Sequence, residues 1–347
     1  MTTPNQTPTE FPKVIAVVGA SSSLGALMLS QLETTLPNCQ LVAIDDHPLI
    51  RPVRQVSAYR MEPNRTGAIL TIEDIPEIMQ MKAWDLVLDN RRLTIADAPD
   101  VFHLESVDSV IHVGSHYDRP NSRAFLEDSL HWVQACRLGG VRQFVYISDI
   151  RVYGAGSQNP VPVTERFEAE PAPEHRSLLE AESKLREGLH EPENQGGLNI
   201  AILRSAMSVG PAASSPVADE LLWNTLASGK NGNVPIQLIH QHDLINAVVF
   251  AITHQLDGIY NVAGSGVIGT RGFRDMCKTG TKKTRIPQNR AVSKKLNLAK
   301  HPLIVSDTKL RQAAGFKSKF SSEQAARAFC HSYLMEPSTR YERSAQQ

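Results

Sequence analysis

The residues with the clearest chemical role are a glycine-rich turn, GASSSLG at 19–25, and an acid twenty residues beyond its end. Residues 14–18 form a short apolar, β-branched run that is typical of a buried parallel strand, and Gly19 lets the chain turn sharply out of it. Gly25 lets the next helix pack closely on the sheet, with its first N–H groups directed at the turn. Asp45 follows a second apolar strand. A carboxylate at this place accepts hydrogen bonds from both hydroxyls of an adenosine ribose and repels a 2′-phosphate. This order of elements predicts an NAD site, with NAD preferred over NADP.

Ser22 stands where such turns carry a middle glycine, at the point where the backbone must approach a pyrophosphate. A serine fits there if its backbone angles are ordinary, and its hydroxyl could donate to a phosphate oxygen. We therefore expect a weakened but retained cofactor site, with Ser23 and Leu24 beside Ser22 in contact with the phosphates. The alternative is an apolar strand followed by an ordinary serine-rich turn.

The elements that would position this turn alternate between strands and helices. An amphipathic helix ends at the double glycine 139–140, between two of the strands. Strands separated by helices indicate βαβ units, so we predict an α/β fold with a Rossmann-type, doubly wound parallel sheet. The length of 347 residues suits this domain together with a smaller second one, which the family resemblance given below identifies as a C-terminal substrate domain. The predicted strands are 14–18, 41–44, 85–88, 109–113, 143–147 and 199–203.

Ligands of such sheets bind beyond the carboxyl ends of the strands. The residues there are our further predicted cofactor contacts: Asp89, Asn90, Val113, Gly114 and Ser148, with Asp149 next to them. Asp243 opens a helix after the strand-like IQLIH, and we interpret it as an N-cap rather than a catalytic acid.

The domain boundaries follow from the same pattern. The polar start lacks the apolar stretch of a signal peptide and reads as a disordered lead-in, and the stretch 46–84 is irregular with one plausible helix, IEDIPEIMQM. We predict a lead-in at 1–12, a Rossmann domain at 13–205 to which 236–256 returns, a smaller domain at 206–235 and 257–335, and a flexible tail at 336–347.

The composition is that of a soluble globular protein. The net charge is zero, with 41% hydrophobic and 21% charged residues among 347, so nothing global points to nucleic acid or a membrane. The four cysteines, Cys39, Cys136, Cys277 and Cys330, match no metal or redox spacing; we expect reduced thiols, no metal site and a cytoplasmic protein. The stretch 271–300 holds ten Lys and Arg against one acid; we read it as a solvated surface, the alternatives being a site for a diphosphate or for RNA.

An ordered set of motifs resembles the extended short-chain dehydrogenase/reductase family, the NAD-dependent epimerases and dehydratases of nucleotide sugars. The set runs over about residues 13 to 330 and includes GASSSLG at 19–25, VDSVIHVGS at 107–115, GGVRQFVYISDIRVYGA at 139–155, ILRSAMSVGP at 202–211 and GIYNVAG at 258–264. The resemblance implies bound NAD, a nucleotide-sugar or other small-molecule substrate under the smaller domain, and a homodimer formed through two helices.

The catalytic positions implied by the resemblance are largely replaced. The family pairs a Tyr with a Lys four residues later; Lys184 is present, but Glu180 takes the place of the Tyr. Asp149 stands at the Ser/Thr position and Phe125 at the Asn position. In one interpretation Glu180 and Lys184 form an ordinary helix pair. In the other, Asp149, Glu180 and Lys184 form a substituted acid/base set. The chain is accordingly an NAD-dependent enzyme with unusual chemistry or a non-catalytic NAD-binding sensor or scaffold.

Overall fold

The computed structural model describes residues 12–20, 22–45, 56–60, 98–113, 129–190, 197–210, 233–278 and 301–335. Several sequence predictions fall outside these residues. They are the strand at 85–88, the helix IEDIPEIMQM, and the site residues Asp89, Asn90, Gly114 and Phe125. The fold below is therefore that of the described part of the chain.

The main sheet has seven parallel strands in the order β10-β6-β5-β4-β1-β2-β3. The order turns back between β1 and β4, which leaves a crevice outside the carboxyl ends of these two strands. The sheet confirms the predicted Rossmann-type architecture. Its strands are β1 (Val14–Val18), β2 (Gln40–Asp45), β3 (Val56–Arg60), β4 (Ser109–Val113), β5 (Gln143–Asp149), β6 (Asn199–Ser205) and β10 (Gly258–Val262).

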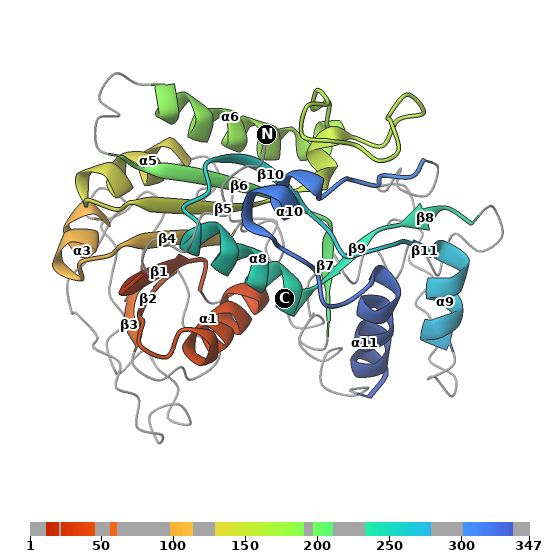
Figure 1. Cartoon of the computed structure of the whole chain (residues 1–347), viewed down its shortest axis with the longest axis horizontal. Coiled ribbons are helices and arrows are strands. Elements are labelled where there is room, and N and C mark those ends of the chain that lie inside the picture. The colour runs from red at the N-terminus through yellow and green to blue at the C-terminus, as the bar shows by residue number, and fades with distance from the viewer. Residues whose placement is uncertain are drawn as a thin grey trace, which may run out of the picture.

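Helices cover both faces of the sheet (Figure 1). On one face lie α1 (Ser23–Thr35) and α8 (Gln241–Thr253), which contact each other. The other face carries α3 (Ala98–Leu104), α5 (Ser129–Leu138) and α6 (Arg176–His190). Because successive strand residues point to opposite faces, Ile15 and Val17 of β1 join the first core, and Val14, Ala16 and Val18 the second. This explains why β1 is a continuous apolar run.

Smaller elements gather at one side of the sheet and have a core of their own (Figure 1). Strands β7 (Met207–Val209) and β9 (Leu238–His240) pair in parallel, and β8 (Pro235–Ile236) pairs antiparallel with β11 (Ile268–Gly269). Val209, Leu238, Phe273, Ala326 and Phe329 are among the residues that pack together here. The helices of this unit are α9 (Thr270–Lys278) and α11 (Ser322–Met335), while α10 (Thr308–Ala314) lies against β10.

The structure corrects three details of the sequence prediction. Strand β3 forms inside the stretch expected to be irregular, because backbone pairing with β2 does not need an apolar run at the sheet edge. Residues 258–262, assigned to the smaller domain, form β10 and extend the main sheet beside β6. Helix α8 begins before Asp243, since the His240 ring accepts the N–H of His242 and caps the helix; Asp243 is therefore not the N-cap.

The cysteine prediction holds only in part. Cys39 and Cys136 are free thiols, and burial raises the pKa of the Cys39 thiol to about 12. Cys330, expected to be reduced, is disulfide-bonded in the small core, where the fold packs α11 against α9. Among the described residues, no helix is both long enough and apolar enough to cross a membrane.

Candidate functional site

The glycine turn adopts the conformation that its two glycines permit. Gly19 has φ +83°, which favours glycine, and its N–H donates to Ile44 O of β2 at 2.9 Å. A Cβ on Gly19 would lie 2.8 Å from Val113 O, so the turn rests on the end of β4. A Cβ on Gly25 would overlap the carbonyl oxygen of Gly19. Both positions therefore require glycine for backbone to approach backbone, as a dinucleotide turn does.

Ser22 caps helix α1 from inside the turn. Its φ of −64° and ψ of 158° are ordinary for serine, as its fit requires. Its Oγ accepts the N–H of Gly25 at 2.9 Å and donates to Gly19 O at 2.7 Å. In this structure the hydroxyl proton is directed at the turn itself. The first N–H groups of α1, those of Ser23 and Leu24, have no acceptor within the helix itself, and such a helix start is able to bind an anion.

The second strand ends where the ribose acid is predicted. Strand β2 runs to Asp45, whose backbone pairs in register with Arg60 of β3; the side chain of Asp45 lies outside the described residues. Val113, another predicted contact, is the last residue of β4 and is buried next to β1. The turn, β2 and β4 therefore meet at the edge of the crevice, where the sequence places the cofactor.

The predicted acid/base residues lie on two different elements. Asp149 ends β5 and is buried, whereas Glu180 on α6 is exposed and Lys184, one turn further along, is half-buried. Oδ1 of Asp149 accepts the N–H of Arg151 at 2.7 Å, and Arg151 Nε lies 2.9 Å from the same oxygen in an ion pair. This pairing starts the short 3₁₀ helix η4 (Ile150–Tyr153).

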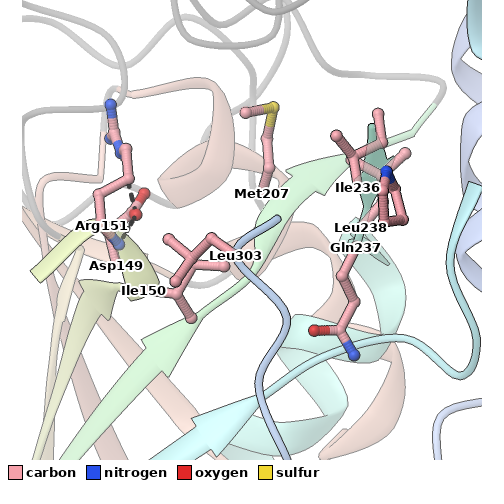
Figure 2. A pocket seen from close by; sticks show the side chains of 9 residues that line it. Asp149, Ile150, Arg151, Met207, Ile236, Gln237, Leu238 and Leu303 are labelled. Carbon is pink, nitrogen blue, oxygen red and sulfur yellow. Dashed lines mark hydrogen bonds and ion pairs between the residues drawn. The ribbon is translucent and has the colours of Figure 1, made fainter. Parts of the chain in front are cut away.

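A pocket opens beside Asp149, between the main sheet and the smaller unit. The pocket spans about 450 Å³, a volume that includes open solvent. Figure 2 shows Asp149 and Arg151 on one side and Ile236 and Leu238 on the other, with Leu303 between them. The remaining described residues of its lining are Ile150, Met207, Pro235 and Gln237. The side-chain amide of Gln237 donates to the carbonyl oxygen of Val305 and accepts the N–H of Val305. The charged residues of the lining are Asp149 and Arg151.

A buried charged cluster, which sequence reasoning missed, lies under the site. Glu182 of α6 is 1% exposed and pairs with Arg204 of β6 at 2.6 Å. Ser148, one of the predicted cofactor contacts, donates its hydroxyl to Glu182 at 2.5 Å. A sequence signal was available: Glu182 occupies the stripe of α6 that otherwise consists of Leu178, Ala181 and Leu185, where a charge requires a partner.

The family follows from a comparison with family models. The model of the NAD dependent epimerase/dehydratase family matches residues 15–263, well over half of the chain. The chain belongs to this family. The matched region includes the glycine turn, Asp149 and Lys184.

Relatives of this epimerase/dehydratase chain are distant. The uncharacterised protein y4nG of Sinorhizobium fredii is 30% identical over 138 residues, 38% of this chain and 33% of that protein. The uncharacterised protein Rv0501 of Mycobacterium tuberculosis is 25% identical over 273 residues, 75% of this chain and 64% of that protein. The chain thus spans less than two thirds of the length of either relative.

Solved structures share the fold. The Bordetella bronchiseptica enzyme WbmG in complex with NAD has a TM-score of 0.63 at 14% identity, covering 94% of both chains. The UDP-glucose 4-epimerase of Thermotoga maritima with UDP-glucose has a TM-score of 0.61 at 15% identity, covering 93% of this chain and 99% of that one. At these identities the likeness concerns the fold alone.

Proposed function

We propose that this epimerase/dehydratase-family chain binds NAD in the crevice between β1 and β4, in preference to NADP. The observation that carries the proposal is the closed glycine turn, in which Gly19 and Gly25 allow the backbone contacts that a pyrophosphate site needs. WbmG, which has the same fold, is a complex with NAD. The end of β2 at Asp45 supports the preference for an unphosphorylated ribose.

The residues that would hold NAD come from three elements, α1, β2 and α6. The amides of Ser23 and Leu24 would take the pyrophosphate, Asp45 the adenosine ribose, and Lys184 the nicotinamide ribose. When bound, the nicotinamide would accept or return a hydride. The protein itself would contribute orientation, exclusion of water and a group that takes or gives the proton of the substrate hydroxyl.

We further propose that the pocket beside Asp149 takes a nucleotide sugar or a similar hydroxyl or carbonyl substrate. Asp149 would hold the proton of that hydroxyl, because it is the buried carboxylate in the lining of the pocket. Glu180, being exposed, would act only when the substrate covers it. The Thermotoga maritima epimerase of the same fold is a complex with UDP-glucose.

A non-catalytic NAD-binding sensor or scaffold is the second candidate. It is favoured by the pairing of Asp149 with Arg151, since the guanidinium lies on the carboxylate oxygen that would otherwise move a proton. It is also favoured by Glu180, which replaces the tyrosine of the family and cannot supply a phenolate. Turnover of a UDP-sugar at about 1 s⁻¹ or faster would exclude this candidate.

Titration calorimetry with NAD⁺, NADH, NADP⁺ and NADPH tests the cofactor proposal. We expect micromolar affinity for the NAD pair and at least about tenfold weaker binding of the NADP pair. Asp45→Ala should remove the discrimination, while Asp46→Ala, the same change at the neighbouring acid, should keep it. Equal affinity for both pairs, or none for either, contradicts the proposal.

A second experiment separates the enzyme from the sensor. If a UDP-sugar is turned over, Asp149→Asn should lower the turnover number by about 10²-fold or more, as expected for loss of a proton-transfer group, while the affinity for NAD⁺ stays unchanged. Glu165→Gln, a comparable change outside the pocket lining, is the control. An unchanged turnover number in Asp149→Asn would remove Asp149 from the mechanism.

A further inference from the structure

Helix α6 is held against the sheet by a directional set of buried polar bonds, here called the Glu182 cluster (Ser148, Glu182 and Arg204). Glu182 accepts from Ser148 Oγ at 2.5 Å, from Arg204 Nε at 3.1 Å and from Arg204 Nη2 at 2.6 Å. Ser148 and Arg204 are neighbours in the register of β5 and β6. All three residues are at most 3% exposed. Bonds of this kind between a fork-shaped cation and a carboxylate require one relative orientation.

The cluster adds contacts that depend on orientation to the apolar packing of α6. Among the described side chains of α6, the buried apolar ones are Leu178, Ala181 and Leu185, of which Ala181 offers little side chain to interlock with the sheet. Apolar contacts are non-directional, whereas the bonds of Glu182 act at defined angles. A rotation of the helix by about 20° would move a side-chain tip about 8 Å from its axis by roughly 3 Å. The rotation of α6 thus decides where Lys184 lies, because residue 184 is two positions from Glu182 and projects from another side of the helix.

The same cluster reaches the element that follows Asp149. The Arg204 guanidinium lies 4.6 Å from the ring centroid of Tyr153 in η4, and the Tyr153 hydroxyl donates to Asn261 Oδ1 at 2.8 Å. Burial alone would lower the pKa of Arg204, but the charge and hydrogen bonds of Glu182 raise it, which keeps the guanidinium charged inside the protein. The Glu182 cluster therefore links the helix of Lys184 to the segment that begins at Asp149.

We propose that Glu182, held by Arg204 and Ser148, is a positioning residue that sets the rotation of α6 and thereby places Lys184 against the cofactor. The proposal rests on the proposed function of Lys184 in binding NAD. A buried apolar residue at position 182 would pack α6 equally well without selecting its rotation. A purely structural role predicts a loss of stability alone, whereas a positioning role predicts a loss of cofactor affinity that depends on Lys184.

A double-mutant cycle on NAD⁺ affinity distinguishes these roles. Glu182→Gln, Lys184→Ala and the double variant are compared with the wild-type chain by calorimetry, with thermal unfolding of each recorded alongside. We expect Glu182→Gln to weaken NAD⁺ binding by about tenfold in the wild-type background and by less than about twofold in the Lys184→Ala background. Glu187→Gln, the same chemical change at an exposed position of α6, should leave the affinity unchanged.

The outcomes separate the inference from the function on which it rests. Equal losses in both backgrounds, or no loss in a folded Glu182→Gln variant, overturn the positioning role while leaving NAD binding in place. If the wild-type chain does not bind NAD⁺, or Lys184→Ala does not weaken binding, the proposed function of Lys184 fails and the inference falls with it. Should Glu182→Gln not fold, Ser148→Ala removes the hydroxyl that donates to Glu182 and leaves the ion pair of Glu182 with Arg204 in place. It should weaken binding by about threefold in the wild-type background, and an unchanged affinity there overturns the proposal.

Discussion

At the scale of single residues, Ser22 shows how a substitution in a glycine turn can be accommodated. Where a glycine would have no side chain, the Ser22 hydroxyl accepts the N–H of Gly25 and donates to the carbonyl oxygen of Gly19. These bonds close the turn on itself before any ligand arrives. The N–H of Gly25 is bonded to the Ser22 hydroxyl, whereas those of Ser23 and Leu24 have no acceptor within α1, so the start of the helix keeps donors of the kind that a phosphate needs.

We predict that Ser22→Ala lowers the free energy of unfolding by about 1 kcal/mol, because the cap of α1 is lost. Ser22→Gly should cost only a few tenths of a kcal/mol, since glycine leaves the helix end open to water. Urea unfolding followed by circular dichroism measures both. Similar stability of Ser22→Ala and the wild-type chain would mean that the cap bonds contribute nothing.

His112 is a second residue whose surroundings decide its behaviour. It lies on β4 among Trp132, Phe144 and Tyr146, and both ring nitrogens are buried without a hydrogen-bond partner among the described residues. Burial lowers the pKa of His112 to about 4. The ring is therefore neutral in the folded protein at pH 7, and in the unfolded chain it takes up a proton near pH 6.5.

We predict that the His112 site destabilises the protein in acid. Between about pH 6.5 and 4 the unfolded chain holds the proton and the folded chain does not. The free energy of unfolding therefore decreases by up to about 3 kcal/mol as the pH is lowered through this range. His112→Phe should remove this share of the pH dependence, and His103→Gln, at an exposed histidine, should keep it. Urea unfolding at several pH values measures the slope; an unaltered slope in His112→Phe refutes the assignment.

At the scale of elements, Asp243 joins two segments that are distant in sequence. Its carboxylate on α8 accepts the N–H of Lys319 at 3.0 Å and that of Phe320 at 2.9 Å. Asp243 is fully buried, and the Phe320 ring stacks on His240 next to it. The first turn of α8 thereby fixes the loop that leads into α11.

We predict that Asp243→Ala lowers the free energy of unfolding by roughly 3 kcal/mol, because two backbone N–H groups lose their charged acceptor. Asp275→Ala, at an exposed acid of α9, should change it by less than about 0.5 kcal/mol. Thermal and urea unfolding provide the comparison. Equal effects of the two substitutions would contradict a structural role for Asp243.

At the scale of the whole molecule, two cores meet at the pocket beside Asp149. The main sheet supplies Asp149, Ile150 and Arg151, and the smaller unit supplies Ile236 and Leu238. A ligand in the crevice and the pocket would therefore contact both units. Because such a ligand binds only the folded protein, it should stabilise both units together.

We predict that NAD⁺ at a hundred times its dissociation constant raises the free energy of unfolding of the wild-type chain by about 2.7 kcal/mol. Gly25→Val should show no such gain, because its side chain would collide with Gly19 and close the site. Urea unfolding with and without NAD⁺ measures the difference. A gain of the same size in Gly25→Val would place the cofactor elsewhere.

Local sequence signals identified most of the sheet and the cofactor turn. Strands β1 and β4 were predicted to the residue and β5 and β6 to within two, because buried parallel strands are continuous apolar runs. The glycine turn was predictable for the same reason, since only glycine tolerates such a close approach of backbones. Edge strand β3 was missed, and the residues of β10 were assigned to the smaller domain. The pairing partners of both strands in the sheet cannot be read from their local sequence.

What the sequence determined by itself is therefore the layered α/β fold and the glycine turn. The tertiary structure decided which acids are buried. It exposes Glu180, pairs Asp149 with Arg151, and encloses Glu182 with Arg204 and Ser148. The physical reason is that burial and ion pairing depend on contacts between β5, β6 and α6, which no local pattern of residues specifies.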